Sequence, residues 1–128
     1  MENLYNWSEK LILIADDDII NFELLNLILR PTKAKLVHLK NGQLVLDYIN
    51  TEQDADLILM DIQMPVLDGL KATEQLRSDE YTGTIFALTA LNTSVNRQQY
   101  MDTGFNEIIE KPVRREAFLK LIGQYLDL

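Results

Sequence analysis

Short apolar runs recur along the chain, and polar residues follow each of them. Residues 10–15, 57–60 and 85–89 are almost continuously apolar, residues 35–39 alternate between polar and apolar, and residues 108–109 form a fifth short run. Continuous apolar runs of this length are typical of strands buried on both faces, and alternation is typical of a half-buried strand. The pattern therefore predicts five short strands.

Segments with helical spacing separate the strands. Asp18 is placed to cap the first helix and Pro31 to stop it, while Gly83 and Gly104 close later segments. Residues 93–101 form the most polar of the predicted helices. The apolar positions that recur at helical spacing are Ile20, Leu24, Leu27 and Ile28, then Leu44, Val45, Tyr48 and Ile49, then Ala72, Thr73 and Leu76, and finally Phe118, Leu119, Leu121, Ile122 and Tyr125.

Five alternating strand–helix units predict a doubly wound α/β fold, with a parallel sheet, right-handed crossovers and helices on both faces. No repeat, low-complexity tract or long linker interrupts the pattern, so residues 1–128 are predicted to form a single domain. A domain of this size buries roughly two-thirds of the surface that its unfolded chain exposes, which suffices for a stable hydrophobic core without disulfides or structural metal ions.

Composition and charge exclude several classes of site. The chain has no cysteine, which rules out disulfides, thiolate catalysis and cysteine-based metal centres. A net charge of −8 argues against binding to nucleic acid, because that affinity comes from lysine and arginine neutralising phosphates. No apolar run approaches the roughly 18 residues that a membrane span needs. A cytoplasmic protein that contacts neither membrane nor nucleic acid is expected.

The residues that carry chemistry follow the predicted strands. They are Asp16 and Asp17, Asp61, Thr89 and Lys111. Each alone has an ordinary explanation, since aspartate and threonine often form turns or cap helices and a lysine is usually a solvated charge. Parallel strands bring their carboxyl ends to one edge, however, and ligands collect at that edge in open α/β sheets. Together these types are what a phosphoryl-transfer site needs.

Carboxylates gathered at one edge repel one another, and a pair about 4 Å apart costs on the order of 4 kcal/mol at an effective dielectric of 20. A cation must therefore sit among them. Oxygen ligands without imidazole or thiolate favour Mg²⁺, which also accepts phosphate oxygens. A carboxylate such as that of Asp61 can then attack phosphorus and form an aspartyl phosphate.

Four motifs in order resemble the receiver domain of two-component response regulators. They are Leu-Ile-Leu-Ile-Ala-Asp16-Asp17, Asp61-Ile-Gln-Met-Pro-Val-Leu-Asp-Gly69, Ala87-Leu-Thr89-Ala90 and Lys111-Pro112, and the resemblance extends from Lys10 to about Tyr125. It implies a flavodoxin-like (βα)5 fold with the strand order 2-1-3-4-5. It also implies a phosphorylation-dependent signalling switch rather than an enzyme that turns over a substrate.

By the same resemblance, Asp61 is the phosphoacceptor, Lys111 pairs with the phosphoryl group and Thr89 moves toward it as the switch hydroxyl. Asp17 and Asp61 would bind Mg²⁺ directly, Asp16 would help through water, and the backbone carbonyl of Gln63 would complete the protein's ligands. The transfer and the later loss of the phosphate would be catalysed largely by the receiver itself. The Lys111–Pro112 peptide is often cis in this family.

The expected switch region contains Thr89, Ala90, Leu91 and Ile108. Gln63 and Leu91 occupy positions that influence phosphate lifetime in the family. Receivers commonly have an aromatic residue that changes rotamer where this chain has Ile108, so another packing change is expected to report the phosphate. Helix 93–101, strand 108–109 and helix 114–126 form the face where signalling and homodimer contacts are expected.

The expected phosphoryl donor is a histidine kinase or a histidine phosphotransfer protein. Asn21 and the Asp-Gly pair after Met64-Pro65 resemble receivers of hybrid histidine kinases and phosphorelays, so the chain is either a free-standing regulator or part of such a kinase. His38, the only histidine, is interpreted as an ordinary strand residue, and Tyr5, Trp7 and Tyr48 as core residues.

Two alternatives stay open. Asp16-x-Asp18 resembles the nucleophile motif of haloacid-dehalogenase-type phosphohydrolases, but those enzymes need an acidic pair at a strand end after their lysine. After Lys111 this chain has only Glu116 and Asp127, within or beyond the last helix. The other alternative is a degenerate receiver that binds partners without being phosphorylated.

Overall fold

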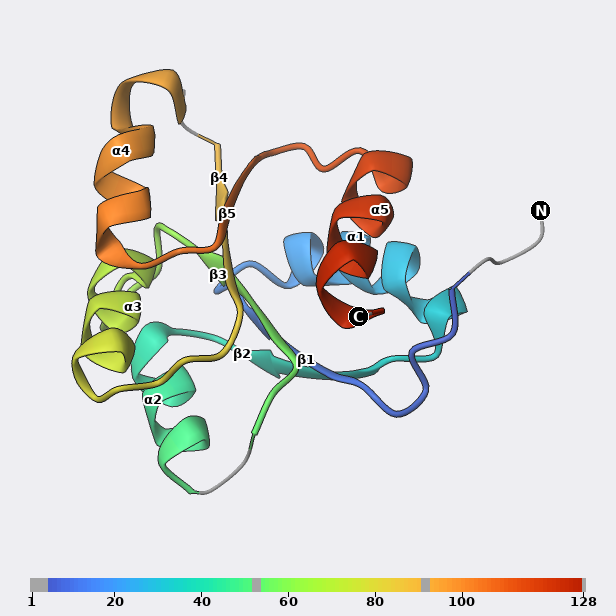
Figure 1. Ribbon diagram of the computed structural model, residues 1–128, viewed down its shortest axis with the longest axis horizontal. Helices are drawn as coiled ribbons and strands as arrows, with labels where there is room; N and C mark the ends of the chain where they lie inside the picture. The colour runs from blue at the N-terminus through green and yellow to red at the C-terminus, as the bar shows by residue number, and fades with distance from the viewer. Residues whose placement is uncertain (1–4, 52–53, 91–92, 128) are drawn as a thin grey trace.

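A parallel five-stranded sheet with the order β2-β1-β3-β4-β5 forms the centre of the molecule (Figure 1). The computed structural model describes residues 5–51, 54–90 and 93–127. This order confirms the predicted doubly wound fold. The strands are β1 (Leu11–Ala15), β2 (Lys35–Leu39), β3 (Leu57–Asp61), β4 (Ile85–Thr89) and β5 (Glu107–Glu110).

The helices begin and end close to the predicted positions. Asp18 caps the first helix by accepting a hydrogen bond from the N–H of Ile20, and Pro31 lies in the 3-10 turn Arg30–Thr32 that follows it. The helices are α1 (Ile19–Leu29), α2 (Gly42–Asn50), α3 (Gly69–Ser78), α4 (Thr93–Thr103) and α5 (Arg115–Leu126). Among the described residues, none of the helices is long and apolar enough to cross a bilayer.

Helices cover both faces of the sheet, with α1 and α5 on one side and α2, α3 and α4 on the other (Figure 1). Side chains alternate between these two cores along each strand, as pleating requires. In β3, Leu57 and Leu59 face α1 and α5, whereas Ile58 and Met60 face the opposite helices. All five residues of β3 are buried, which explains its continuous apolar run.

The segment before β1 closes the core between α1 and α5. The Trp7 side chain is only 1% exposed, and its indole N–H donates to Oδ1 of Asp127 at 2.8 Å. Tyr5 lies beside it, with ring centroids 5.1 Å apart. The expectation that Trp7 and Tyr5 pack in the core is confirmed, because Tyr5 contacts the same buried cluster.

The apolar spacing identifies α1 but not its buried face. Leu25 and Leu29 are buried, whereas Ile20, Leu24 and Leu27 are 66%, 54% and 57% exposed. Apolar residues occupy almost the whole circumference of this helix, so no single apolar stripe marks the side that faces the sheet. A row of large aliphatic side chains is left in solvent.

Candidate functional site

The carboxyl ends of four strands bring the predicted polar residues to one edge of the sheet. Asp16 directly follows β1, Asp61 and Thr89 are the last residues of β3 and β4, and Lys111 directly follows β5. Strands β1 and β3 are neighbours, and Ala15 pairs with Met60. This register places Asp16 beside Asp61.

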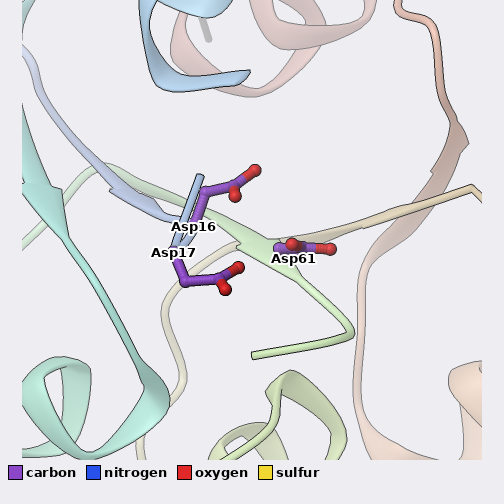
Figure 2. A group of neighbouring side chains, drawn as sticks. All are labelled: Asp16, Asp17 and Asp61. Carbon is purple, nitrogen blue, oxygen red and sulfur yellow. The ribbon is translucent and has the colours of Figure 1, made fainter. Parts of the chain in front are cut away.

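Three carboxylates meet at this edge. One oxygen from each of Asp16, Asp17 and Asp61 lies within 4.8 Å of the others (Figure 2). Asp16 is fully buried and Asp61 is 7% exposed, whereas Asp17 is exposed. The cluster therefore has two acids fixed in the fold and one at its solvent side.

Lys111 supplies the positive charge on the protein side of this cluster. Its Nζ lies 3.2 Å from Oδ1 of Asp61 and 3.5 Å from Oδ2 of Asp16, and its side chain is 21% exposed. One ammonium group cannot neutralise three carboxylates. The remaining negative charge suits a divalent cation.

Burial raises the pKa of the Asp61 carboxyl above its ordinary value. The charge of Lys111 lowers this pKa, and the charge of Asp16 raises it further. Because the pKa of Asp61 is raised overall, Lys111 does not fully compensate the free-energy cost of ionising Asp61 in this buried position. A cation bound here would favour the ionised, nucleophilic form.

The backbone around Asp61 leaves little freedom. The N–H of Gly69 donates to the carbonyl of Ile62 at 2.9 Å. A β-carbon on Gly69 would lie 2.2 Å from the carbonyl oxygen of Asp61, so only glycine fits here. Asp68 then caps α3 by accepting from the N–H of Lys71 at 2.8 Å. The Asp-Gly pair of the motif thus folds the turn tightly against the end of β3.

The other residues expected at the site lie around its rim. The Thr89 side chain is 2% exposed. Ala90 is exposed, and Ile108 is half-buried opposite Ala87, within the core that faces α2, α3 and α4. Leu91 lies outside the described residues. The Lys111–Pro112 peptide is cis, as the resemblance implied.

Gln63 lies in the turn after β3, and its N–H is directed at Oδ1 of Asp61 at 3.4 Å. The part expected of its carbonyl as a metal ligand stays a prediction. The oxygen-only donor set of Asp16, Asp17 and Asp61 fits Mg²⁺, since that ion takes one or two carboxylates and fills its remaining positions with water and phosphate.

His38 contacts the backbone of this site, which the sequence alone does not predict. Its Nε2 lies 2.7 Å from the backbone carbonyl oxygen of Asp16, and its ring stacks on Phe22. The signal was the position of His38 one residue before the end of a strand. That position becomes informative only once β2 is known to lie beside β1, because Ile14 then pairs with His38.

A family model of the response regulator receiver domain matches residues 12–123. The chain belongs to this family. The site geometry agrees with that membership, since the acidic pair, the strand-end aspartate, the threonine and the lysine lie together. The chain is therefore a receiver domain of two-component signalling, and the haloacid-dehalogenase alternative is not supported.

Relatives of known type include free-standing regulators and large kinases. The two-component response regulator ARR22 of Arabidopsis thaliana is 33% identical over 118 residues, which cover 91% of this chain and 83% of ARR22. Hybrid signal transduction histidine kinase M of Dictyostelium discoideum is 32% identical, with coverage of 87% of this chain and 5% of that kinase. The chain thus spans most of one relative and a small part of the other.

Solved receiver structures share the fold. The receiver domain of Ssk1 from Saccharomyces cerevisiae, crystallised with the histidine phosphotransfer protein Ypd1, is 32% identical with a TM-score of 0.83 over 92% of this chain and 89% of that one. The receiver domain of the kinase PA1611 from Pseudomonas aeruginosa has magnesium in its active site cleft. It is 27% identical with a TM-score of 0.82, over 93% of this chain and 98% of that one.

Proposed function

We propose that Asp61 accepts a phosphoryl group from a phosphohistidine, and that Asp16, Asp17 and Asp61 hold Mg²⁺ during the transfer. One observation carries this proposal. Asp61 lies at a strand end with two carboxylates within 4.8 Å and an ammonium group 3.2 Å away. A metal site and a cation beside a partly buried nucleophile are what phosphoryl transfer to a carboxylate needs.

The chain's own residues have distinct tasks in this transfer. A carboxylate oxygen of Asp61 attacks phosphorus, the N–P bond of the phosphohistidine breaks, and the imidazole nitrogen that leaves takes up a proton. Mg²⁺, when bound, neutralises the charge on phosphoryl oxygens. The ammonium of Lys111 pairs with one phosphoryl oxygen, and the hydroxyl of Thr89 donates to another. Water later attacks phosphorus and restores the Asp61 carboxylate.

The donor would dock on the exposed apolar side of α1. Ile20, Leu24 and Leu27 are more than half exposed there. A hollow of about 600 Å³ runs from Asp16 and Lys111 past Leu24 and Leu27, so the apolar surface continues into the site. The similarity to a receiver that was crystallised with a histidine phosphotransfer protein supports a partner of that kind.

Replacing Leu24 with Asp tests this docking surface. We expect the variant to accept phosphate more slowly from a phosphorylated histidine phosphotransfer protein, because it places a charge in an apolar contact. Phosphorylation by acetyl phosphate should be unchanged, because that small donor needs no docking surface. Equal loss with both donors would argue against the surface, since it would mean that the site itself is damaged.

Phosphorylation would change the face formed by α4, β5 and α5. The dianionic group draws Thr89 toward it, and the segment between β4 and α4 must repack as a result. Ile108 of β5 pairs with Ala87 of β4 and is half-buried, so it can respond by shifting in the core without the rotamer change of an aromatic ring. Pairing of two copies through this face stays a prediction.

Acetyl phosphate with Mg²⁺ tests the phosphoacceptor assignment directly. Intact-mass measurement should show one added phosphoryl group on the wild type and none on Asp61→Asn. Glu74→Gln, an exposed acid on α3, is the matched control and should be phosphorylated normally. Loss of the modification in Asp16→Asn but not in Asp61→Asn would overturn the assignment. A wild type that responds neither to acetyl phosphate nor to beryllofluoride would instead favour a degenerate receiver.

A further inference from the structure

The His38 side chain connects β2 to the backbone of the acidic loop. Its Nε2 lies 2.7 Å from the carbonyl oxygen of Asp16. A carbonyl oxygen only accepts hydrogen bonds, so Nε2 carries the proton and donates it. Phe22 of α1 holds the imidazole ring in place. Its ring is stacked on the imidazole with centroids 4.2 Å apart and an interplanar angle of 7°.

This contact completes the anchoring of Asp16 on β2. The N–H of Asp16 donates to the carbonyl of Leu39 at 3.0 Å, and the carbonyl of Asp16 accepts from His38. The Asp16 carbonyl and the Asp17 N–H belong to one rigid peptide plane. Fixing the carbonyl therefore fixes the direction in which the main chain enters Asp17.

Asp17 is the acid whose position depends most on its backbone. Its side chain is exposed, whereas the side chains of Asp16 and Asp61 are held by burial. Packing therefore restrains the Asp17 carboxylate least of the three. Two hydrogen bonds flank Asp17: His38 holds the peptide before it, and the N–H of Asp18 after it donates to Oδ1 of Asp16 at 2.9 Å. The Asp17 carboxylate lies close enough to the other two to share an ion with them.

We propose that His38 is a positioning residue for the metal site: its Nε2–H holds the Asp16–Asp17 peptide so that the Asp17 carboxylate faces Asp16 and Asp61. This proposal rests on the proposed function, since it assumes that Mg²⁺ binds these acids. Residues that orient metal ligands through a hydrogen bond typically change metal affinity about 10- to 100-fold when they are replaced.

Two substitutions separate the hydrogen bond from the stacking. His38→Phe keeps an aromatic ring that can stack on Phe22 but removes the donor. His38→Gln removes the ring but keeps an amide N–H at a similar distance along the side chain. If His38 acts only by packing, His38→Phe should keep more of the Mg²⁺ affinity. If His38 positions the peptide through its hydrogen bond, His38→Gln should keep more of it.

Mg²⁺ affinity of the unphosphorylated protein, measured by isothermal titration calorimetry, is the deciding readout. We expect His38→Phe to bind Mg²⁺ about tenfold more weakly than the wild type. His38→Gln should bind with nearly wild-type affinity, even if urea unfolding shows that it is the less stable of the two. Wild-type affinity in His38→Phe, or equal weakening in both variants, would overturn the proposal.

The wild type gives a second test that needs no variant. A hydrogen-bonded Nε2–H of His38 should give an imidazole N–H signal that is protected from solvent exchange in a ¹H–¹⁵N spectrum, and its absence would also overturn the proposal. Failure of the proposed function has a different outcome, because the wild type itself would then bind no Mg²⁺ or would take up no phosphoryl group from acetyl phosphate. The two failures are therefore distinguishable.

Discussion

Nζ of Lys111 lies closer to Asp61, at 3.2 Å, than to Asp16, at 3.5 Å. A phosphoryl group on Asp61 would take over this contact, and we propose that Lys111 thereby links phosphorylation to the conformational change. We expect Lys111→Ala to keep the fold but to lose the response of the α4–β5–α5 face. Amide chemical shifts with and without beryllofluoride measure that response.

Lys120→Ala is the control for this substitution, because Lys120 is an exposed lysine of α5. It should respond to beryllofluoride as the wild type does. Normal shifts on the α4–β5–α5 face in Lys111→Ala would contradict the role assigned to Lys111.

Asp61→Asn should make the protein more stable in buffer without Mg²⁺ at pH 7. Burial raises the pKa of Asp61 above 3.8, so the folded state favours the protonated form. The stability from this preference is fully present below the ordinary pKa and is lost as the pH rises through the raised value. Removing the charge should therefore raise the free energy of unfolding at pH 7 by about 1 kcal/mol, after allowance for solvent screening.

Urea unfolding measures this effect. The advantage of Asp61→Asn should shrink as the pH falls toward the ordinary pKa, because the wild-type carboxyl then becomes neutral as well. Added Mg²⁺ should also reduce it, since an ion that binds only the folded wild type stabilises that state. A variant less stable than the wild type at pH 7 without Mg²⁺ would contradict the charge argument.

Arg77 joins α3 to the loops at the opposite end of the sheet. Its guanidinium donates to the carbonyls of Gly104 and Tyr81 at 2.9 and 2.7 Å and to Oδ1 of Asn106 at 3.0 Å. Arg77→Met should lower the free energy of unfolding by about 2–4 kcal/mol, because it removes the donor to the partly buried carbonyls of Gly104 and Tyr81, although Oδ1 of Asn106 keeps its hydrogen bond from the N–H of Ile85. Lys71→Met, exposed on the same helix, should change it by less than about 0.5 kcal/mol in the same urea titration.

Tyr125 should make stability depend on pH at the alkaline end. Its hydroxyl donates to Oε2 of Glu107 at 2.5 Å, and burial together with this acid raises the pKa of Tyr125 to about 12. The resulting stability is fully present below the ordinary pKa of 10.0 and is lost as the pH rises toward 12.

Tyr125→Phe should accordingly be less stable than the wild type by about 1 kcal/mol below pH 10. The difference should disappear as the pH approaches 12, and urea midpoints at a series of pH values measure it. Tyr48→Phe on α2 is the control. A difference between Tyr125→Phe and the wild type that stays constant across this range would show that the raised pKa does not contribute.

Much of the site could be predicted because strand ends are visible in the sequence. Apolar strands buried on both faces are interrupted sharply by Asp16, Asp61 and Thr89, and the parallel topology then brings those residues together. Lys111 follows the same rule at the end of β5. These inferences need only local patterns and the rule that parallel strands share one carboxyl edge.

Features that depend on the relation between elements could not be predicted. The buried face of α1 is ambiguous in sequence, because Leu24 and Leu25 have the same side chain, yet only Leu25 faces the sheet. The sequence predicts only an ordinary strand residue at His38, because its contact with Asp16 arises from the pairing of β2 with β1. Such contacts follow from register, which a single sequence does not show.

The close packing at Gly69 bears on how the protein would accommodate a phosphoryl group on Asp61. The turn after β3 packs so closely against the end of that strand that a β-carbon on Gly69 would clash with the carbonyl oxygen of Asp61, and this packing restricts movement of the Asp61 main chain. If Asp61 is phosphorylated as proposed, we expect its main chain to stay in place and the neighbouring residues to move to accommodate the phosphoryl group. On this proposal, the conformational change would occur in the elements around Asp61 and not in the strand that carries it.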